Sequence, residues 1–335
     1  MLFFYKILFF NTLIMGSLIA ISAYSWFNMW IGLEINLLSM IPLMKSNFNM
    51  YPAESTLKYF ITQSLASTFI LLAIIMSYNT QEIFSNNNIY LMIMNSALLT
   101  KLGAAPFHAW FPEVIEGLNW LNSLLMLTWQ KIAPMILIMY NLKMTVFLSF
   151  IIMISVVIGG VMGINQISLR KILAYSSINH IAWMLAGMLF MSNIWMSYFI
   201  IYMMISINII YIFYILNTFT LNQLFSKINS NKIIKMFFIF NFMSLGGLPP
   251  FLGFLPKWLV INNLINNNFY FISLLLILFT LITLYFYIRI SLSTFSLAYQ
   301  EVTLNNEYIS NFFMMYTNLF ILSSLFMCTS LFNFL

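Results

Sequence analysis

The stretch LLTKLGAAPFHAWFP, residues 98–112, places a lysine, a glycine and two prolines inside an otherwise apolar run. A second stretch, GLPPFLGFLP at residues 247–256, resembles its C-terminal part. Glycine and proline interrupt helices, and paired interruptions in corresponding halves of a membrane protein are typical of transporters built from repeats. A chance likeness between two stretches rich in phenylalanine and proline is the alternative. Four positions match at one constant offset: Gly103, Pro106, Phe107 and Pro112 with Gly247, Pro250, Phe251 and Pro256.

The composition around these stretches indicates an integral membrane protein. Hydrophobic residues make up 62% of the 335 residues and charged residues only 6%, whereas soluble domains carry about 25% charged residues. A spanning helix needs about 20 mostly apolar residues. The sequence therefore predicts an all-α polytopic membrane protein with eleven transmembrane helices, near residues 3–22, 25–44, 57–78, 89–105, 120–141, 146–164, 171–190, 194–217, 236–258, 268–291 and 311–333.

The connectors between these segments are too short to fold as soluble domains, so we expect one transmembrane domain over residues 1–335. The two glycine–proline stretches fall on the fourth and ninth segments. Helices five apart run in opposite directions, which predicts inverted repeats, each with one broken helix. The first repeat would cover about 1–141 and the second about 146–291, followed by a C-terminal helix at about 311–333.

The basic residues lie mostly in the connectors on one side of the predicted membrane. The side that holds the N-terminus receives nine of the 13 lysines and arginines, and the other side receives only Lys143. This bias follows the positive-inside rule and explains the net charge of +6 without a nucleic-acid partner. The remaining three basic residues fall inside predicted helices: Lys101, Lys131 and Lys257.

The sequence predicts no metal or cofactor site in this chain. Cys328 is the only cysteine, and two histidines are too few and too far apart for a metal cluster. We find no glycine-rich dinucleotide motif after a strand and no Walker loop. We therefore expect no catalytic, redox or nucleotide-binding residue.

Four ionisable residues stand out within the predicted spans: Glu34, Lys101, Lys131 and Lys257. A charge at the bilayer centre costs about 2.5–3.5 kcal/mol, and such residues are candidates for function. A buried lysine balanced between desolvation and a nearby carboxylate can bind and release a proton near neutral pH. We interpret Glu34 and Lys101 as such a switch. The alternatives are a static ion pair that fixes helix packing and, for Lys257, a side chain that extends to the membrane surface.

The two histidines are weaker candidates for proton relays. His108 follows Pro106 in the first interruption, where it could relay protons from Lys101 or cap exposed backbone. His180 lies in a polar cluster, AYSSINHIAW, that could line a wet path or form hydrogen bonds between helices.

Six stretches together support a resemblance to a known family over essentially the whole chain. Their order along the chain is the same as in the antiporter-like, proton-pumping membrane subunits of mitochondrial NADH–ubiquinone oxidoreductase, respiratory complex I. The chain is most similar to the animal, insect-like form. The stretches are WIGLEINLLSMIPL, LKYFITQSLAS, ALLTKLGAAPFHAWFPEVIEGLNW, MLTWQKIAP, SLRKILAYSSINHIAWM and NFMSLGGLPPFLGFLPKWLV.

The resemblance implies a role for each candidate residue. Glu34 matches the glutamate that pairs with the lysine matched by Lys101. Lys131 matches the connecting lysine, and Lys257 the lysine of the second broken helix. His180 matches a polar position on the central water axis.

The resemblance also implies a location and partners. We expect a proton-translocating subunit of the inner mitochondrial membrane, with its N-terminus in the matrix and its C-terminus in the intermembrane space. Its partners would be other membrane-arm subunits, accessory subunits and phospholipids such as cardiolipin. FMN, the iron–sulfur clusters and ubiquinone would belong to partner subunits. The alternatives are a self-standing cation/proton antiporter and a structural scaffold subunit.

Overall fold

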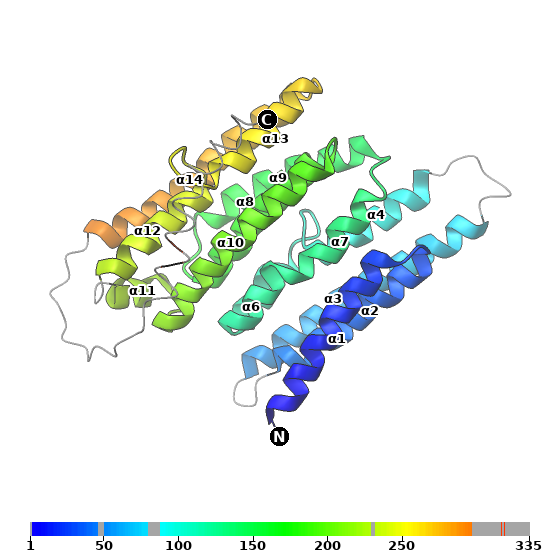
Figure 1. Cartoon of the computed structure of the whole chain (residues 1–335), viewed down its shortest axis with the longest axis horizontal. Coiled ribbons are helices and arrows are strands. Elements are labelled where there is room, and N and C mark those ends of the chain that lie inside the picture. The colour runs from blue at the N-terminus through cyan, green and yellow to red at the C-terminus, as the bar shows by residue number, and fades with distance from the viewer. Residues whose placement is uncertain are drawn as a thin grey trace. The chain divides into compact units, whose positions relative to one another are not determined.

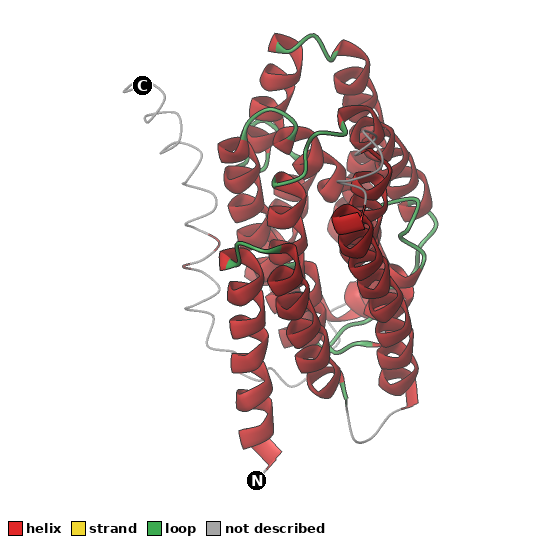
Figure 2. Cartoon of the chain, turned by 90° about the vertical axis from the view of Figure 1, so that its right-hand side faces the viewer, coloured by secondary structure: helices red, strands yellow, loops and turns green. Residues whose placement is uncertain are grey.

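The computed structural model describes residues 2–45, 50–79, 88–228 and 232–296, together with Tyr316 and Asn318. These residues form α-helices joined by short loops (Figure 2). The described part contains no strand, and its one isolated β-bridge joins Ser168 to Thr220. The chain divides into two compact units, Met1–Ser155 and Val156–Leu335, whose boundary falls inside one helix.

The first unit contains seven helices and most of an eighth (Figure 1). In the described residues α3 packs against α2, α4 and α5, while α7 packs against α1, α4 and α6. The helices are α1 (Leu2–Ser22), α2 (Trp26–Met44), α3 (Met50–Asn79), α4 (Asn88–Leu102), α5 (Trp110–Gly117), α6 (Trp120–Leu127), α7 (Trp129–Met139) and α8 (Thr145–Gly163).

The second unit is organised around α9 (Leu169–Met188), which contacts α10, α13 and α14. Every side chain of α9 from Ile172 to Met188 is buried, including the polar cluster around His180. A helix that is buried on all sides lies at the core of its unit. The other helices are α10 (Ser192–Leu216), α11 (Leu221–Ile228), α12 (Lys232–Gly246), α13 (Phe254–Asn266) and α14 (Tyr270–Ser296).

Seven helical segments of the described chain are long and apolar enough to cross a membrane. Two shorter apolar helices, Ile89–Leu102 and Ile233–Gly246, are those that precede the glycine–proline stretches. The expected span at 311–333 lies outside the described residues apart from Tyr316 and Asn318, so the count of eleven stays a prediction. The seven segments are Phe4–Ser22, Trp26–Met44, Tyr51–Tyr78, Trp120–Met139, Thr145–Gly163, Ser192–Leu216 and Tyr270–Thr294.

Several helix boundaries differ from those expected. Helix α3 begins at Met50 rather than at residue 57, and its added turns carry the Glu54–Lys58 pair at helical spacing. The expected helix 120–141 is divided at Thr128, where ψ is −73°. The short helix α11 was not expected at all.

Two glycines allow α1 and α2 to lie side by side (Figure 1). The backbone of Gly32 faces Ala20 and Gly16 so closely that a Cβ atom on Gly32 would lie 2.5 Å from the Ala20 nitrogen and 2.8 Å from the Gly16 oxygen. Small residues at a helix contact permit close backbone approach in membranes. This contact therefore fixes α2, which carries Glu34, against α1.

We predict that Gly32→Ala will destabilise the first unit. Its new Cβ would meet backbone atoms, and overpacking of this kind costs about 1–3 kcal/mol. The thermal unfolding midpoint of the full chain in detergent should fall. Gly246→Ala is the control, because its Cβ would find its nearest atom, Tyr287 Cδ2, at an ordinary 3.5 Å. Equal midpoints for the two variants would contradict the prediction.

Candidate functional site

The first interruption turns the chain back toward the end of α4. Gly103 has a φ of +74°, which side chains rarely adopt, and the Ala105–Pro106 peptide is cis. The indole Nε1 of Trp110, at the start of α5, donates a hydrogen bond to the carbonyl of Thr100 at 3.0 Å. This turn brings α5 alongside the last turn of α4, which carries Lys101.

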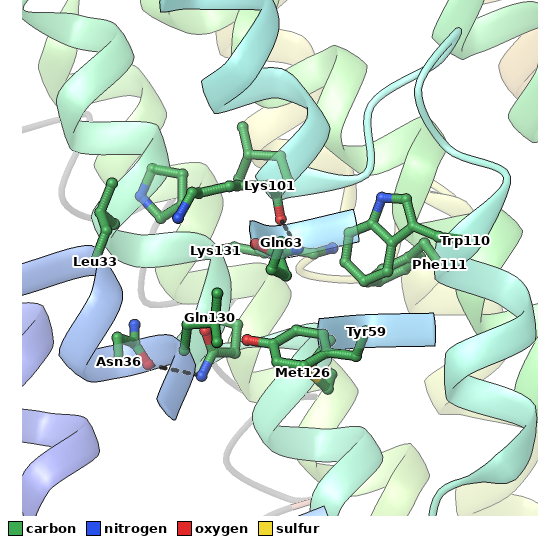
Figure 3. A pocket seen from close by; sticks show the side chains of 13 residues that line it. Leu33, Asn36, Tyr59, Gln63, Lys101, Trp110, Phe111, Met126, Gln130 and Lys131 are labelled. Atoms are coloured by element: carbon green, nitrogen blue, oxygen red, sulfur yellow. Dashed lines mark hydrogen bonds between the residues drawn. The ribbon is translucent and has the colours of Figure 1, made fainter. Parts of the chain in front are cut away.

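Lys101 and Lys131 line the same cavity in the first unit (Figure 3). Their side chains are buried, with 7% and 1% of each residue exposed. The cavity leaves about 20 Å³ for the centre of a water molecule, which is about the space that one water needs. Polar side chains on three further positions, together with a tyrosine, also line it: Asn36, Gln63, Gln130 and Tyr59.

Two hydrogen bonds organise the polar wall of this cavity. Gln130 Nε2 donates to Asn36 Oδ1 at 2.9 Å, which connects α7 to α2. Gln63 Nε2, on α3, donates to the backbone carbonyl of Lys101 at 3.4 Å. Figure 3 shows both contacts beside the two lysines. Side chains from four helices therefore meet at one buried point.

An irregular backbone surrounds Lys131. The helix is interrupted at Thr128, whose hydroxyl donates to the carbonyl of Leu124 at 2.7 Å. Pro134, one turn later, has no N–H to donate to the carbonyl of Gln130. The ammonium nitrogen of Lys131 lies 5.6 Å from the centroid of the Phe111 ring, within range of a cation–π contact. Phe111 therefore packs between the first interruption and Lys131.

Glu34 lies near this cavity without lining it. The side chain is half-buried on α2 and forms no ion pair within 4.0 Å with Lys101. The structure thus does not join Glu34 and Lys101 in a direct salt bridge.

His108 lies apart from the two lysines. Its ring is half-buried, it is not part of the cavity lining, and its Nδ1 lies 3.3 Å from the carbonyl oxygen of Pro106. The ring therefore contacts local backbone and not the cavity.

An exposed ion pair joins α5 to α3. The Lys58 ammonium contacts both Glu54 and Glu113 at 2.8 Å. A Cβ atom on Gly117 would lie 2.6 Å from Ser55 Cβ, so the two helices touch there. Glu113 is 54% exposed and is paired with Lys58.

Lys257 directly follows the second interruption, in α13. Gly247 has a φ of +79°, and α12 ends at the residue before it. The ammonium of Lys257, which is only 7% exposed, donates to the carbonyls of Gly246 at 2.8 Å and Leu245 at 3.4 Å. It also lies 6.0 Å from the centroid of the Trp183 ring. Lys257 therefore caps the C-terminus of α12, and the extension to the membrane surface does not describe this geometry.

His180 faces the same interruption from α9. Its Nδ1 shares a 2.8 Å hydrogen bond with the hydroxyl of Tyr198, and its ring lies 5.0 Å from that of Tyr202. His180 lines a small cavity of about 10 Å³ together with Leu245 of α12 and with Gly253 and Pro256 of the interruption. His180 and the second interruption thus border one cavity, which Lys257 does not line.

The residues that sequence reasoning missed are mostly uncharged. Asn36, Gln63 and Gln130 have polar amide side chains within otherwise apolar helices. A polar residue in such a position was the signal that could have identified them as cavity residues. Among the described residues, no group of three or more histidines, cysteines or carboxylates could hold a metal ion.

We predict that Gly247→Ala will displace Lys257. A Cβ there would force a side chain into the left-handed region and would lie 2.9 Å from the Lys257 nitrogen. Left-handed backbone alone costs about 1–2 kcal/mol. The full chain should lose thermal stability, and Lys257 should become reactive toward an amine-modifying reagent, read by mass spectrometry. The control Gly246→Ala should match the parent in thermal stability and in the reactivity of Lys257. If Lys257 stays unreactive in Gly247→Ala, the prediction is wrong.

The fold and these sites define a class: helical polytopic membrane proteins with buried lysines at helix interruptions. Residues 23–283 match the family described as NADH:quinone oxidoreductase/Mrp antiporter, TM. The chain therefore belongs to this family.

Individual proteins similar to this chain carry a common name. NADH-ubiquinone oxidoreductase chain 2 of Anopheles gambiae is 52% identical over 293 residues, covering 86% of this chain and 85% of the relative. The protein of that name from Locusta migratoria is 46% identical over 297 residues, covering 88% of this chain and 87% of the relative. The resemblance read from the sequence is confirmed.

A solved structure shares the fold. A chain of respiratory complex I from Thermus thermophilus matches with a TM-score of 0.84 at 21% identity, covering 96% of this chain and 77% of that chain.

Proposed function

We propose that this chain is a proton-translocating membrane-arm subunit of NADH:ubiquinone oxidoreductase, respiratory complex I. The names of relatives at up to 52% identity support this assignment. The chain would lie in the inner mitochondrial membrane, with its N-terminus in the matrix, as the distribution of basic residues predicts. NADH oxidation and ubiquinone reduction, with FMN and the iron–sulfur clusters, would occur in partner subunits.

The observation that carries the proposal is the cavity shared by Lys101 and Lys131. Two lysines buried in an apolar protein are costly unless polar groups compensate them. Here amide side chains, a tyrosine and space for one water surround both. An ammonium group at one lysine can release a proton that the amine of the other accepts through a bridging water. The cavity is thus suited to a two-site proton relay.

Glu34 would set the charge state of Lys101 from outside the cavity. Because the two are not in direct contact, a small movement of α2 changes their electrostatic interaction without breaking a salt bridge. Because Asn36 of α2 is hydrogen-bonded to Gln130, such a movement would also displace Gln130, the neighbour of Lys131 in the chain. Glu34 is therefore proposed as a modulator of the relay.

Lys257 is proposed as the proton site of the second unit. Its ammonium is held by two carbonyl acceptors, which favour the charged form, while burial opposes it. His180, across the interruption, is a candidate relay toward Lys257, and His108 is a candidate relay at the outer edge of the first interruption. The driving energy would arrive from partners, since moving one charge against 100 mV requires about 2.3 kcal/mol.

We predict that Lys101→Met and Lys131→Met will each lower proton pumping by at least about tenfold, as expected for loss of a proton-transfer group. The readout is protons translocated per NADH oxidised by the assembled complex in membrane vesicles. Lys58→Gln is the control, because its exposed ion pairs contribute little.

Lys101→Arg separates a proton site from a structural cation. Arginine keeps the positive charge but does not release its proton, so assembly on native gels should survive while pumping fails. Normal pumping by Lys101→Arg would support a scaffold role instead. A chain that migrates free of the NADH-oxidising complex and exchanges sodium for protons would support a self-standing antiporter.

We predict that Glu34→Gln will reduce pumping less than Lys101→Met does. The amide removes the negative charge that acts on Lys101 but leaves both cavity lysines in place. The same vesicle assay measures the effect, and the Glu54→Gln variant is the exposed carboxylate control. A Glu34→Gln variant equal to the parent would exclude Glu34 from the mechanism.

A further inference from the structure

A second, larger cavity lies in the second unit, far along the sequence from the lysines of the first. It has a volume of about 470 Å³ and is bordered by four elements: the end of α8 with the loop after it, the start of α9, α11, and the last turns of α14. Nothing in the proposed relay uses this cavity. It is large enough for part of a small organic ligand.

The cavity lies at the level expected for lipid headgroups. Helix α14 leaves its preceding loop at Tyr270, and Arg289 is nineteen residues further on, about 28 Å along the helix axis. The hydrocarbon core of a bilayer is about 30 Å thick. Helix α8 runs for 19 residues from Thr145 to Gly163, so its C-terminal end reaches the same depth. Arg289 and Gly163 both border the cavity, which therefore opens where the hydrocarbon ends.

The lining combines one cation with apolar walls. Arg289 is exposed, and its guanidinium has no hydrogen bond or ion pair with any described residue. No carboxylate borders the cavity. Asn165 and Gln166 add amide groups, whereas most other lining residues are isoleucine or phenylalanine. The cavity thus offers a fixed positive charge above an apolar pocket.

Nearby basic residues of the same unit are already engaged. The ammonium of Lys227 donates to the carbonyls of Leu216 and Asn217 at 3.0 and 3.1 Å. The guanidinium of Arg170 lies 4.6 Å from the centroid of the Phe219 ring. They contribute positive potential, but Arg289 is the cation that borders the cavity.

We propose that this cavity binds an anionic phospholipid, with its phosphate on Arg289 and the upper part of an acyl chain against the apolar wall. A planar guanidinium matches phosphate in a bidentate geometry. A free inorganic anion would gain nothing from the isoleucine and phenylalanine side chains. A lipid satisfies both the charge and the apolar surface at this depth.

The test compares lipid retention by the purified full chain. Parent, Arg289→Gln and Lys143→Gln proteins are equilibrated with nanodiscs of phosphatidylcholine with or without phosphatidylglycerol, extracted gently, and analysed by native mass spectrometry. Lys143 is an exposed cation of the first unit that borders no part of this cavity. We expect the parent to retain phosphatidylglycerol over phosphatidylcholine, and Arg289→Gln to bind it about fivefold more weakly. Lys143→Gln should match the parent.

Three outcomes would overturn the proposal. Equal retention of phosphatidylglycerol by Arg289→Gln and parent would remove the role of Arg289. Displacement of the bound lipid by inorganic phosphate would assign the site to a soluble anion. A photo-crosslinker at position 293, which borders the cavity and leaves Arg289 in place, would assign the surface to a partner subunit if it captured protein but no lipid in native membranes. None of these outcomes depends on proton pumping.

Discussion

The cost of burying a lysine ammonium governs much of this structure. Lipid offers no hydrogen-bond acceptor, so a buried ammonium must find acceptors within the protein. Each buried lysine lies beside an irregularity in its helix: Lys101 before Gly103, Lys131 after Thr128 and Lys257 against the end of α12. Helix ends leave carbonyl groups without helical partners. At the second interruption the carbonyls at the end of α12 accept hydrogen bonds from Lys257, so this lysine and this helix end stabilise each other.

The two interruptions share one backbone conformation, but a different side chain packs against the glycine in each. Gly103 and Gly247 have nearly the same left-handed φ, at +74° and +79°. At the first, the space above the glycine is filled by Phe111, and at the second it is filled by Lys257. The first lysine thus precedes its turn and opens onto a cavity, whereas the second follows its turn and binds the carbonyls directly. Inverted repeats remain a prediction, but the shared turn is consistent with them.

The sequence predicted those features that depend on residues close together along the chain. Glycine, proline and lysine inside apolar runs are local signals, and they located both interruptions and the three lysines. The break at Thr128 was missed because neither glycine nor proline marks it. The contacts of Gln130 with Asn36 and of Gln63 with the Lys101 carbonyl were missed because they join separate helices. The separation of Glu34 from Lys101 likewise depends on helix packing, which no spacing along the chain reveals.

The exposed Lys58 shows why burial matters more than residue type. Lys58 is paired with two carboxylates in contact with water, so its charge is satisfied and screened. Lys101 and Lys131 border a cavity whose lining includes no carboxylate. Charging one of them makes charging the other less favourable, because like charges repel strongly at low dielectric. The proposed relay would therefore hold a single proton between its two sites, with Glu34 of α2 as the proposed modulator of Lys101.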